Sequence, residues 1–263
     1  MEIIAIVNQK GGVAKTTTAI NLASSLAEIG ENILLIDIDP QANLTQGIGL
    51  DKKNKTTYEV LKGEINFNNA IYNTKIEPDS WTGIIDVIPA SIELANAELE
   101  FSGEIGRETL LKEAFKEAGG DEYYSKKYDY MIIDTNPSLG LLTVNALSIS
   151  NSLIIPLEPS MFALDGIEQL IEVIKLIRKK INSSLNIKGV LLTRVDGRTN
   201  IAKEFEEELK EVFGNKVFDT LIHQNVKISE AQSEQLPINI YDRKARGTKE
   251  YAKLAQELIN YEW

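Results

Sequence analysis

The sequence of 263 residues contains no cysteine and a single histidine, His223. Without cysteine, the chain can form no disulfide, no thiolate metal site and no cysteine nucleophile. No apolar run approaches the roughly 20 residues that a membrane-spanning helix needs. The first residues, Met1–Glu2–Ile3, lack the basic segment of a secretory signal peptide and lead directly into an apolar run. We therefore expect a cytoplasmic protein.

Basic residues are outnumbered, because 28 Lys and Arg stand against 39 Asp and Glu, which gives a net charge of −11. This balance argues against nucleic-acid binding driven by overall charge, although it leaves room for a local basic patch. The length is sufficient for a sizeable core, and no repeat or linker rich in Pro, Gly or Ser divides the chain. We predict a single domain over residues 1–263.

Seven short runs rich in Ile, Leu and Val alternate with segments of helical periodicity. The predicted strands are Ile3–Val7, Asn32–Asp37, Ile84–Pro89, Tyr130–Asp134, Leu153–Leu157, Ile187–Thr193 and Lys216–Ile222. The predicted helices include Thr18–Ile29, Ala163–Ile181, Asn200–Phe213 and Thr248–Tyr261, with small surface helices between Thr56 and Gly83. Continuous apolar strands separated by amphipathic helices indicate an α/β fold: a doubly wound, mainly parallel sheet with helices on both faces.

The stretch Asn8–Thr17, which reads NQKGGVAKTT, joins the first predicted strand to the first predicted helix. Glycines let such a turn fold around phosphate oxygens, and the helix N-terminus directs free N–H groups at them. In this arrangement Lys15 can reach the outer phosphates, and the hydroxyl of Thr16 can ligate Mg²⁺. The alternative is a simple glycine turn before a capped helix, with an incidental Lys-Thr pair.

This loop departs from the standard P-loop pattern, G-x-x-x-x-G-K-[ST], which would place glycines where the chain has Gln9 and Ala14. A second lysine, Lys10, directly precedes the pair Gly11–Gly12. Because a Cβ disfavours left-handed backbone, we expect Ala14 to adopt a right-handed or extended conformation and to weaken nucleotide binding.

Acidic residues follow two of the predicted strands, at the edge where parallel sheets bind ligands. Asp37 and Asp39 share one strand face by the two-residue period, and we expect both near the phosphate loop. Asp134 ends another strand and is typical of a Walker B acid, which holds Mg²⁺ through water. Strand-terminal aspartates can also simply cap the next turn. Two such strands beside one glycine loop favour the phosphate site.

The motif K-G-G-x-x-K-T-T at Lys10–Thr17 resembles the deviant Walker A loop of the ParA/MinD group of ATPases. Further blocks, spread over nearly the whole chain, are similar to ParA/Soj partition ATPases. They are Asp37–Asn43, Ile88–Ala95, Gly106–Leu111, Tyr128–Asp134, Pro137–Ala146, Phe162–Gly166, Gly189–Thr193, Arg198–Asn200, Asn225–Ala231 and Tyr241–Gly247.

The resemblance implies a P-loop ATPase that uses ATP and Mg²⁺. Lys10 would reach across a dimer interface to the partner's nucleotide, and Asp39 would position the attacking water. Thr16 and Asp134 would serve Mg²⁺, Asp134 through water. The implied catalytic residues are thus Lys10, Lys15 and Asp39. The implied nucleotide-binding residues are Lys10, Gly11, Gly12, Val13, Ala14, Lys15, Thr16 and Thr17.

Besides Ala14, which stands where the group usually has glycine, two further places depart from the family pattern. Asn136 replaces a usual proline, so we expect the loop after Asp134 to differ in stiffness. His223 falls within Ile222–Asn225, the stretch that the resemblance places beside the adenine. For this residue we favour a lone surface histidine over a ring stacked on the base.

Two segments are locally basic. Seven basic residues between Lys175 and Arg198 accompany one acid, Asp196, and residues 243–249 hold four more basic residues. The resemblance places DNA contacts at Arg198 and Lys227, and the second segment adds Arg243 and Arg246. Without a recognition helix, binding should be directed to phosphates, indifferent to sequence and sensitive to salt. Composition alone allows solvated basic faces equally well.

The resemblance also implies three partners: a second copy of the chain in the presence of ATP, nonspecific double-stranded DNA, and a ParB-like centromere-binding protein. It implies association with the nucleoid and no contact with membrane. Two alternatives remain. A MinD-like membrane ATPase should end in a basic amphipathic helix, whereas this sequence ends in the acidic Leu258–Trp263. A metabolic ATP-dependent ligase of the same superfamily would need neither Lys10 nor a basic face.

Overall fold

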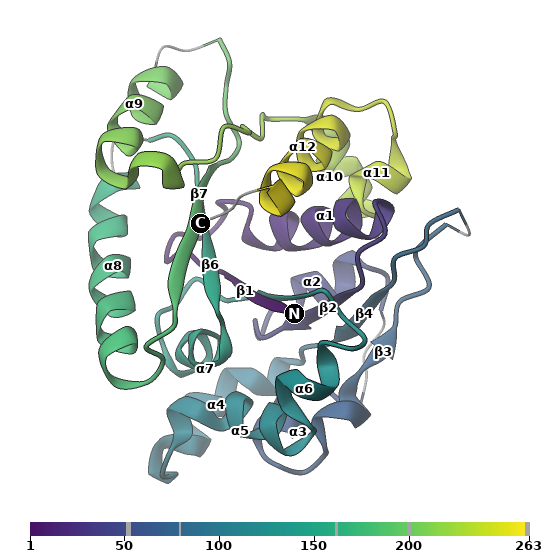
Figure 1. Ribbon diagram of the computed structural model, residues 1–263, viewed down its shortest axis with the longest axis vertical. Coiled ribbons are helices and arrows are strands. Elements are labelled where there is room, and N and C mark those ends of the chain that lie inside the picture. Colours follow the sequence, from purple (N-terminus) through teal and green to yellow (C-terminus); the bar gives the residue numbers. More distant parts are fainter. Residues whose placement is uncertain (51–53, 79, 161–162, 199–200, 261–263) are drawn as a thin grey trace.

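The computed structural model describes residues 1–50, 54–78, 80–160, 163–198 and 201–260 (Figure 1). Within them, one seven-stranded sheet has the order β3-β4-β2-β5-β1-β6-β7. All neighbouring strands pair in parallel except β3, which is antiparallel to β4. The strands are β1 (Glu2–Ile6), β2 (Ile33–Asp37), β3 (Tyr72–Asn73), β4 (Ile85–Ile88), β5 (Tyr130–Asp134), β6 (Ser152–Leu157) and β7 (Asn186–Leu192).

The helices cover both faces of this sheet, as the sequence predicts. The α-helices are α1 (Lys15–Glu28), α2 (Asn43–Gly47), α3 (Thr57–Leu61), α4 (Ala97–Glu100), α5 (Leu110–Glu117), α6 (Gly120–Tyr124), α7 (Leu141–Ile149), α8 (Ala163–Lys180), α9 (Ile201–Phe213), α10 (Val226–Ser233), α11 (Ile238–Tyr241) and α12 (Arg246–Asn260). Short 3₁₀ helices are η1 (Phe67–Ala70), η2 (Ile92–Asn96), η3 (Phe101–Gly103), η4 (Arg107–Thr109) and η5 (Gly214–Lys216).

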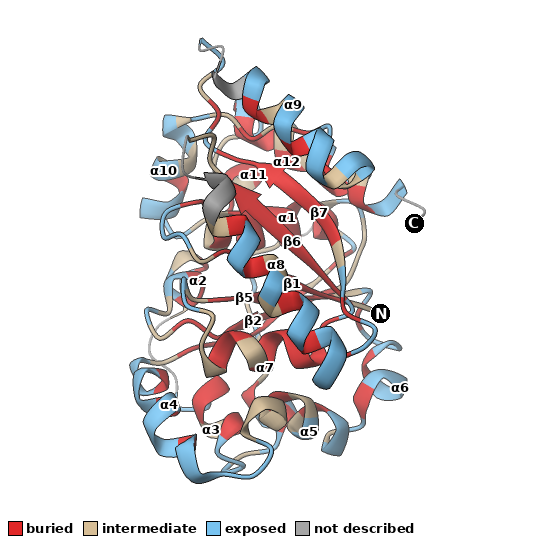
Figure 2. Cartoon of the chain, turned by 90° about the vertical axis from the view of Figure 1, so that its left-hand side faces the viewer, coloured by how far each residue is buried: buried red, intermediate tan, exposed pale blue. Residues whose placement is uncertain are grey.

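The alternation of side chains along each strand divides the core into two layers. Ile4 and Ile6 of β1 pack with α1 and α12 on one face of the sheet. On the other face, Ile3 packs with α3, α5 and α7, and Ala5 packs with α8 and α9. In Figure 1, α8 and α9 lie on the opposite side of β6 and β7 from α1 and α12. Figure 2 shows the central strands buried over most of their length, while the outer faces of α8 and α9 are exposed. Such double coverage explains why the strands are uninterrupted apolar runs.

Six predicted strands are confirmed to within one residue at each end, but the prediction of a strand at Lys216–Ile222 is wrong. Only Val217 forms a bridge there, to Val190. The backbone N–H groups of Asp219 and Thr220 donate instead to the carboxylate of Glu257, at 2.6 and 3.0 Å. Because these donors are taken by a side chain of α12, no regular ladder forms.

The seventh strand is β3, which lies in a segment where the sequence predicts small surface helices. The helical part of that prediction is confirmed by α3 and η1. The predicted helices 163–181, 200–213 and 248–261 correspond to α8, α9 and α12, with Asn200 and Tyr261 outside the described residues. Among the described residues, no helix is both long and apolar enough to cross a membrane.

Gly189 offers a test of how β7 and the following segment pack. A Cβ at this position would lie 2.3 Å from Cε2 of Phe218, so the ring closes over the bare backbone. We predict that Gly189→Ala lowers the free energy of unfolding by about 1–3 kcal/mol, as expected for an overpacked core. Urea denaturation measures this change.

The matched control is Gly166→Ala in α8, where nothing described lies within 4 Å of the added Cβ. Alanine has the higher helix propensity, so this variant should be unchanged or more stable by up to about 1 kcal/mol. Equal stability of the two variants would contradict the packing of Phe218 on Gly189.

Candidate nucleotide-binding site

The phosphate loop and the acidic residues meet at the carboxyl ends of three adjacent strands. In the register of the sheet, Asp134 on β5 pairs with Ile6 of β1 on one side and with Asp37 of β2 on the other. The loop from Val7 to Ala14 leaves β1 at this edge and leads into α1. The strand order therefore brings together residues that are more than 100 positions apart.

The loop has the backbone conformation of a phosphate cradle. Gly12 has a φ of 78° and Ala14 a φ of 64°, both in the left-handed region. Ala14 is the N-cap of α1 and its side chain accepts no hydrogen bond, so the first N–H groups of the helix stay available. The expectation of a right-handed or extended Ala14 is wrong. The surrounding fold imposes the left-handed turn at a cost of about 1–2 kcal/mol.

Lys15 is the cationic centre of the loop. Its side chain is buried, and Nζ donates to the carbonyl oxygen of Lys10 at 3.3 Å. Burial lowers the pKa of the Lys15 ammonium, while the charges of Asp134 and Asp39 act in the opposite direction. An ammonium group held among backbone carbonyls and carboxylates in this way is placed to meet an anion at the loop.

Asp134 and Thr16 form the junction between β5 and α1. Thr16 Oγ1 donates to Asp134 Oδ2 at 2.6 Å, and Asp134 is fully buried. Burial, and next the charge of Asp37, raises the pKa of the Asp134 carboxyl well above its usual value. Among the described residues, its other oxygen, Oδ1, has no hydrogen-bond partner. A buried, unpaired carboxylate oxygen beside a threonine hydroxyl fits the surroundings of a hydrated divalent cation.

Asp37 and Asp39 have separate positions. The Asp37 carboxylate accepts hydrogen bonds from the N–H and the hydroxyl of Thr45 in α2, at 2.9 and 2.7 Å. Burial raises the pKa of Asp37 to about 6. Asp39 lines the central cavity, and its Oδ1 accepts from the N–H of Gln41 at 2.9 Å. Both acids thus lie near the phosphate loop, Asp37 through its register with Asp134, but the Asp37 carboxylate is bonded to the start of α2 and only Asp39 lines the cavity.

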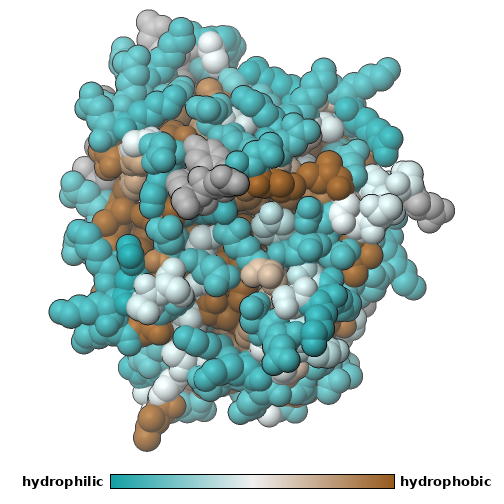
Figure 3. All heavy atoms as spheres, in the orientation of Figure 1, coloured by the Kyte–Doolittle hydropathy of each residue, from teal (hydrophilic) through white to brown (hydrophobic). Residues whose placement is uncertain are grey.

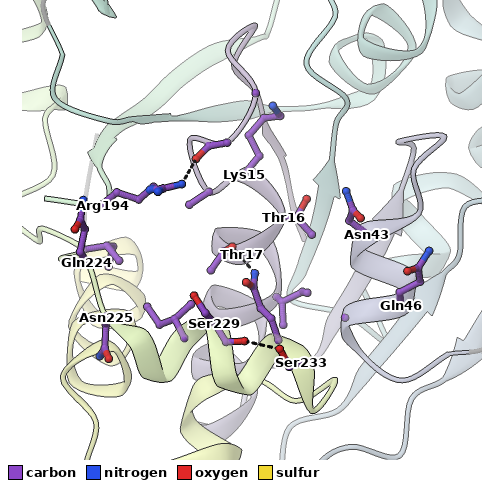
Figure 4. A pocket seen from close by; sticks show the side chains of 18 of the residues that line it. Lys15, Thr16, Thr17, Asn43, Gln46, Arg194, Gln224, Asn225, Ser229 and Ser233 are labelled. Atoms are coloured by element: carbon purple, nitrogen blue, oxygen red, sulfur yellow. Dashed lines mark hydrogen bonds between the residues drawn. The ribbon is translucent and has the colours of Figure 1, made fainter.

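A cavity of about 880 Å³ opens over the phosphate loop (Figure 4). One wall consists of Gly11, Gly12 and the start of α1, and the other of α10 and the segment 222–225. Its lining includes Ile20, Asp39, Asn43, Ile222, His223, Asn225, Ile228, Ser229, Gln232 and Tyr251. A lining that combines polar side chains with the apolar Ile20, Ile222 and Ile228 suits a ligand that carries both phosphates and a ring system.

The sequence model of one protein family, described as an AAA domain, matches residues 1–187. The sporulation initiation inhibitor protein Soj of Bacillus subtilis is 46% identical over 259 residues, which cover 98% of both chains. The chromosome partitioning protein ParA of Caulobacter vibrioides is 39% identical, over 100% of this chain and 95% of its own. The chain belongs to the ParA/Soj family of chromosome-partitioning ATPases.

A solved structure of cobyrinic acid a,c-diamide synthase from Mycobacterium smegmatis, with a bound ATP analogue and magnesium, shares the fold. Its TM-score is 0.82 and its identity 31%, over 98% of this chain and 94% of its own. The identity to the ParA and Soj proteins is higher over the same length.

Two side chains that the sequence does not single out contact the loop of this ParA/Soj protein. Arg194 Nη1 donates to the carbonyl oxygen of Gly12 at 3.1 Å, from a left-handed backbone with φ 52° (Figure 4). Gln232 Nε2 of α10 donates to Thr17 Oγ1 at 2.7 Å. Arg194 lies two residues after the end of β7, at the carboxyl edge of the sheet, and this position is a signal that could have been used. Gln232 lies 215 residues from its partner, and no local pattern indicates it.

The residues of the ParA/Soj motif differ in their position relative to the cavity. Gly11, Gly12, Ala14, Lys15, Thr16 and Thr17 line the cavity, whereas Val13 is buried beneath it. The exposed Lys10 lies outside the lining of the described cavity, and its Nζ is 3.4 Å from Ser160 Oγ. The structure therefore brings Lys15, Thr16, Asp39 and Asp134 together, whereas the side chain of Lys10 lies apart from them and only its carbonyl oxygen contacts Lys15.

His223 and Asn136, the two further departures from the family pattern, both have defined partners. His223 is only 15% exposed, and its Nδ1 lies 2.8 Å from Glu250 Oε1, so the prediction of a lone surface histidine is wrong. Asn136 Oδ1 accepts from the hydroxyl of Thr143 in α7 at 3.0 Å. This bond ties the loop after Asp134 to α7.

Two of the four predicted DNA-binding residues line a hollow that adjoins the same cavity. Arg198 and Arg246 line a hollow of about 630 Å³ that shares residues 223–226 with the nucleotide cavity. Each is paired with a carboxylate, Arg198 with Asp196 at 2.7 Å and Arg246 with Glu250 at 2.6 Å. Lys227 pairs with Glu230 at 2.7 Å, and Arg243 is exposed before α12.

The left-handed Ala14 gives a prediction about nucleotide affinity. Because the loop already holds this conformation, Ala14→Gly should leave ATP affinity within about threefold of the parent value. The backbone strain of about 1–2 kcal/mol is present in the free loop and in the ATP-bound loop alike, so its relief changes the stability of the fold and not the affinity. Isothermal titration calorimetry measures the affinity.

Ala14→Val is the contrasting variant, because a β-branched residue does not tolerate positive φ. It should weaken ATP binding by at least about tenfold, equivalent to about 1.4 kcal/mol. A large gain in affinity for Ala14→Gly would show that the loop is not preformed.

Proposed function

We propose that this ATPase segregates DNA by closing into a dimer around two ATP molecules, binding duplex DNA nonspecifically and releasing it on hydrolysis. The observation that carries this proposal is the buried Thr16–Asp134 junction, with its unpaired carboxylate oxygen beside Lys15 and Asp39. Phosphoryl transfer needs positioning and charge neutralisation more than covalent chemistry. The site offers both within one chain.

Each residue of the site has a separate task in this proposal. Lys15 and the N–H groups of the loop neutralise the outer phosphates. Asp39 faces the same cavity and orients the attacking water. Thr16 and Asp134 would hold Mg²⁺, which neutralises charge that develops on the phosphate oxygens.

Lys10 and Gly11 support the dimer in particular. The Lys10 side chain stands outside its own described cavity, so its charge is available to a nucleotide bound by a second copy. Gly11 is exposed, and nothing described lies within 4 Å of the position of its missing Cβ. A bare backbone at this position would let the facing loop of a second copy approach closely. Hydrolysis would then remove the contacts that hold the dimer.

DNA binding rests on the basic residues beside the cavity. Dimerisation doubles the surface that holds Arg198, Lys227, Arg243 and Arg246, and phosphates would replace the present carboxylate partners of Arg198, Lys227 and Arg246. Because such binding does not depend on sequence, it would associate the protein with the nucleoid. A ParB-like centromere-binding protein would then stimulate hydrolysis and release the DNA.

The similarity to the diamide synthase keeps a metabolic ligase as the second candidate. The deciding experiment is ATP hydrolysis with and without duplex DNA of unrelated sequences. A segregation ATPase should turn over slowly alone and respond to every duplex to a similar degree. A ligase should ignore DNA and should require a small carboxylate to hydrolyse ATP.

Asp39 gives a prediction that separates binding from hydrolysis. Asp39→Ala removes the acid that orients water but no group that binds the phosphates, so it should bind ATP and remain dimeric. Its turnover should fall by about 10²-fold or more, the usual contribution of a positioned acid or base. A phosphate-release assay measures this rate.

Lys15→Ala is the matched comparison, because it removes the buried cation of the loop. It should keep its fold, which circular dichroism checks, and should lose ATP binding. Hydrolysis of ATP by Asp39→Ala at the parent rate would contradict the proposal that Asp39 orients the attacking water.

Charge reversal tests the proposed DNA surface. Arg198→Glu and Lys227→Glu should weaken ATP-dependent binding of all duplexes alike and lower the log–log salt slope by about 0.9 for each DNA phosphate that the variant no longer neutralises. ATP-dependent dimerisation should persist. Fluorescence anisotropy at several salt concentrations measures the affinity and its salt slope, and light scattering measures dimerisation.

Lys62→Glu is the control, because it makes the same charge change at α3, away from residues 198–246. It should bind DNA like the parent. An equal loss in the control, or a strong preference for one duplex sequence, would contradict binding through this surface.

A further inference from the structure

Two residues at the phosphate loop have a left-handed backbone although neither is glycine. Ala14 has a φ of 64° and Arg194 a φ of 52°. This conformation is costly for a residue with a Cβ and persists only where the surrounding structure imposes it. Alanine has no side-chain donor or acceptor, so it cannot offset the cost itself. The contacts that hold Ala14 in this conformation therefore come from other parts of the fold.

Two of these contacts come from the residues directly after β7. Thr193 Oγ1 donates to the carbonyl oxygen of Val13 at 3.0 Å. Arg194 Nη1 donates to the carbonyl oxygen of Gly12 at 3.1 Å (Figure 4). We call the side chains of Thr193 and Arg194 the β7 clamp. The oxygens that it holds belong to the two peptide units directly before Ala14, so the clamp acts on the backbone that leads into the strained residue.

The β7 clamp also fixes the direction of two backbone donors. In a trans peptide unit, the C=O and the N–H point in opposite directions. Holding the carbonyl oxygens of Gly12 and Val13 therefore sets the direction of the N–H groups of Val13 and Ala14. Backbone N–H groups before and at the start of a helix are the groups that bind phosphate. The clamp thus acts on the part of the loop that a nucleotide needs.

The two members of the β7 clamp differ in their surroundings. Thr193 is fully buried. The side chain of Arg194 is 52% exposed, and its Nε lies 3.6 Å from Oε1 of Glu158, in the segment after β6. Arg194 also lines the nucleotide cavity. Because it is half-exposed, its donor groups can be removed without opening the core, which makes Arg194 the member that an experiment can vary.

We propose that Arg194 is a positioning residue for ATP. Through the carbonyl oxygen of Gly12, it holds the phosphate loop in its binding conformation and compensates for alanine at position 14. Without this bond, the backbone of Ala14 relaxes towards the right-handed region in part of the molecules. The apparent dissociation constant for ATP then rises by the inverse of the fraction that keeps the binding conformation. The proposal concerns nucleotide binding alone and depends on neither the dimer nor DNA.

A double-mutant cycle between positions 194 and 14 tests this role. Arg194→Met keeps an unbranched stem but removes every donor, and it should weaken ATP binding at least about fivefold, as expected for the loss of a hydrogen bond from a charged donor. In an Ala14→Gly background, the same change should alter affinity by less than about twofold, because glycine adopts positive φ without cost. Isothermal titration calorimetry with Mg²⁺ and ATP measures the four affinities, and circular dichroism checks the folds.

The cycle separates positioning from a direct contact with the nucleotide. An arginine that binds a phosphate, or acts through its charge alone, would lose the same affinity with either residue at position 14. An equal loss in both backgrounds therefore overturns the proposal. Unchanged affinity of Arg194→Met in the parent background overturns it as well, because the β7 clamp would then be dispensable.

Steady-state hydrolysis adds a second criterion. A residue that only positions the loop acts on the bound substrate and on the transition state alike, so Arg194→Met should raise KM and leave kcat within about twofold of the parent value. Ala14→Gly should bring KM back. A fall in kcat of about tenfold or more, with KM unchanged, would instead show that Arg194 stabilises the transition state, and it would overturn the positioning role.

The matched control is Arg178→Met, which removes an exposed arginine from the last turn of α8. That turn leads to the amino end of β7, whereas the phosphate loop lies at the carboxyl ends of the strands. Figure 3 shows mainly hydrophilic residues at the left edge, where Figure 1 places α8 and α9, so one methionine creates no large apolar patch. The control should bind ATP like the parent. A loss equal to that of Arg194→Met would attribute the effect to net charge and overturn the proposal.

Discussion

The hydrogen bond between Thr16 and Asp134 joins the first turn of α1 to the end of the central strand β5. The rest of the site depends on this junction, because it fixes the phosphate loop relative to the acids of β5 and β2. Asp134 is fully buried and keeps one oxygen unpaired among the described residues. A buried carboxylate of this kind is costly to hold without a partner, so the folded chain keeps a place where a cation would be stabilised.

Two loops leave the sheet beside this junction, and each is tied to a helix of the outer layer. The loop after Asp134 is tied through Asn136 to α7, and the segment after β2 is tied through Asp37 to α2 and α3. The two glutamates of α4 in turn accept hydrogen bonds from the first residue of α7 and from a tyrosine of α3. Because packed elements tend to shift between discrete positions, a change at the phosphates can reach the outer layer through these contacts.

Much of this structure could be predicted from the sequence because its signals are local. Uninterrupted apolar runs indicate six of the strands, and the Lys15–Thr16 pair after a glycine turn indicates the phosphate site. Long-range contacts explain the errors. Glu257 takes the donors of the expected strand after Lys216, and Glu250 pairs with His223, the residue predicted to be a lone surface histidine. The left-handed Ala14 follows from the surrounding fold, which overrides the local preference of alanine.

The central claim is that ATP closes two copies of the chain over their phosphate loops. Gly11→Val tests it most directly, because the added side chain meets nothing described within one chain but would obstruct a facing loop. The measurement is light scattering with ATP in an Asp39→Ala background, with and without Gly11→Val. We predict that the valine variant binds ATP, stays monomeric and loses ATP-dependent DNA binding. A valine variant that still dimerises and binds DNA with ATP would contradict the account.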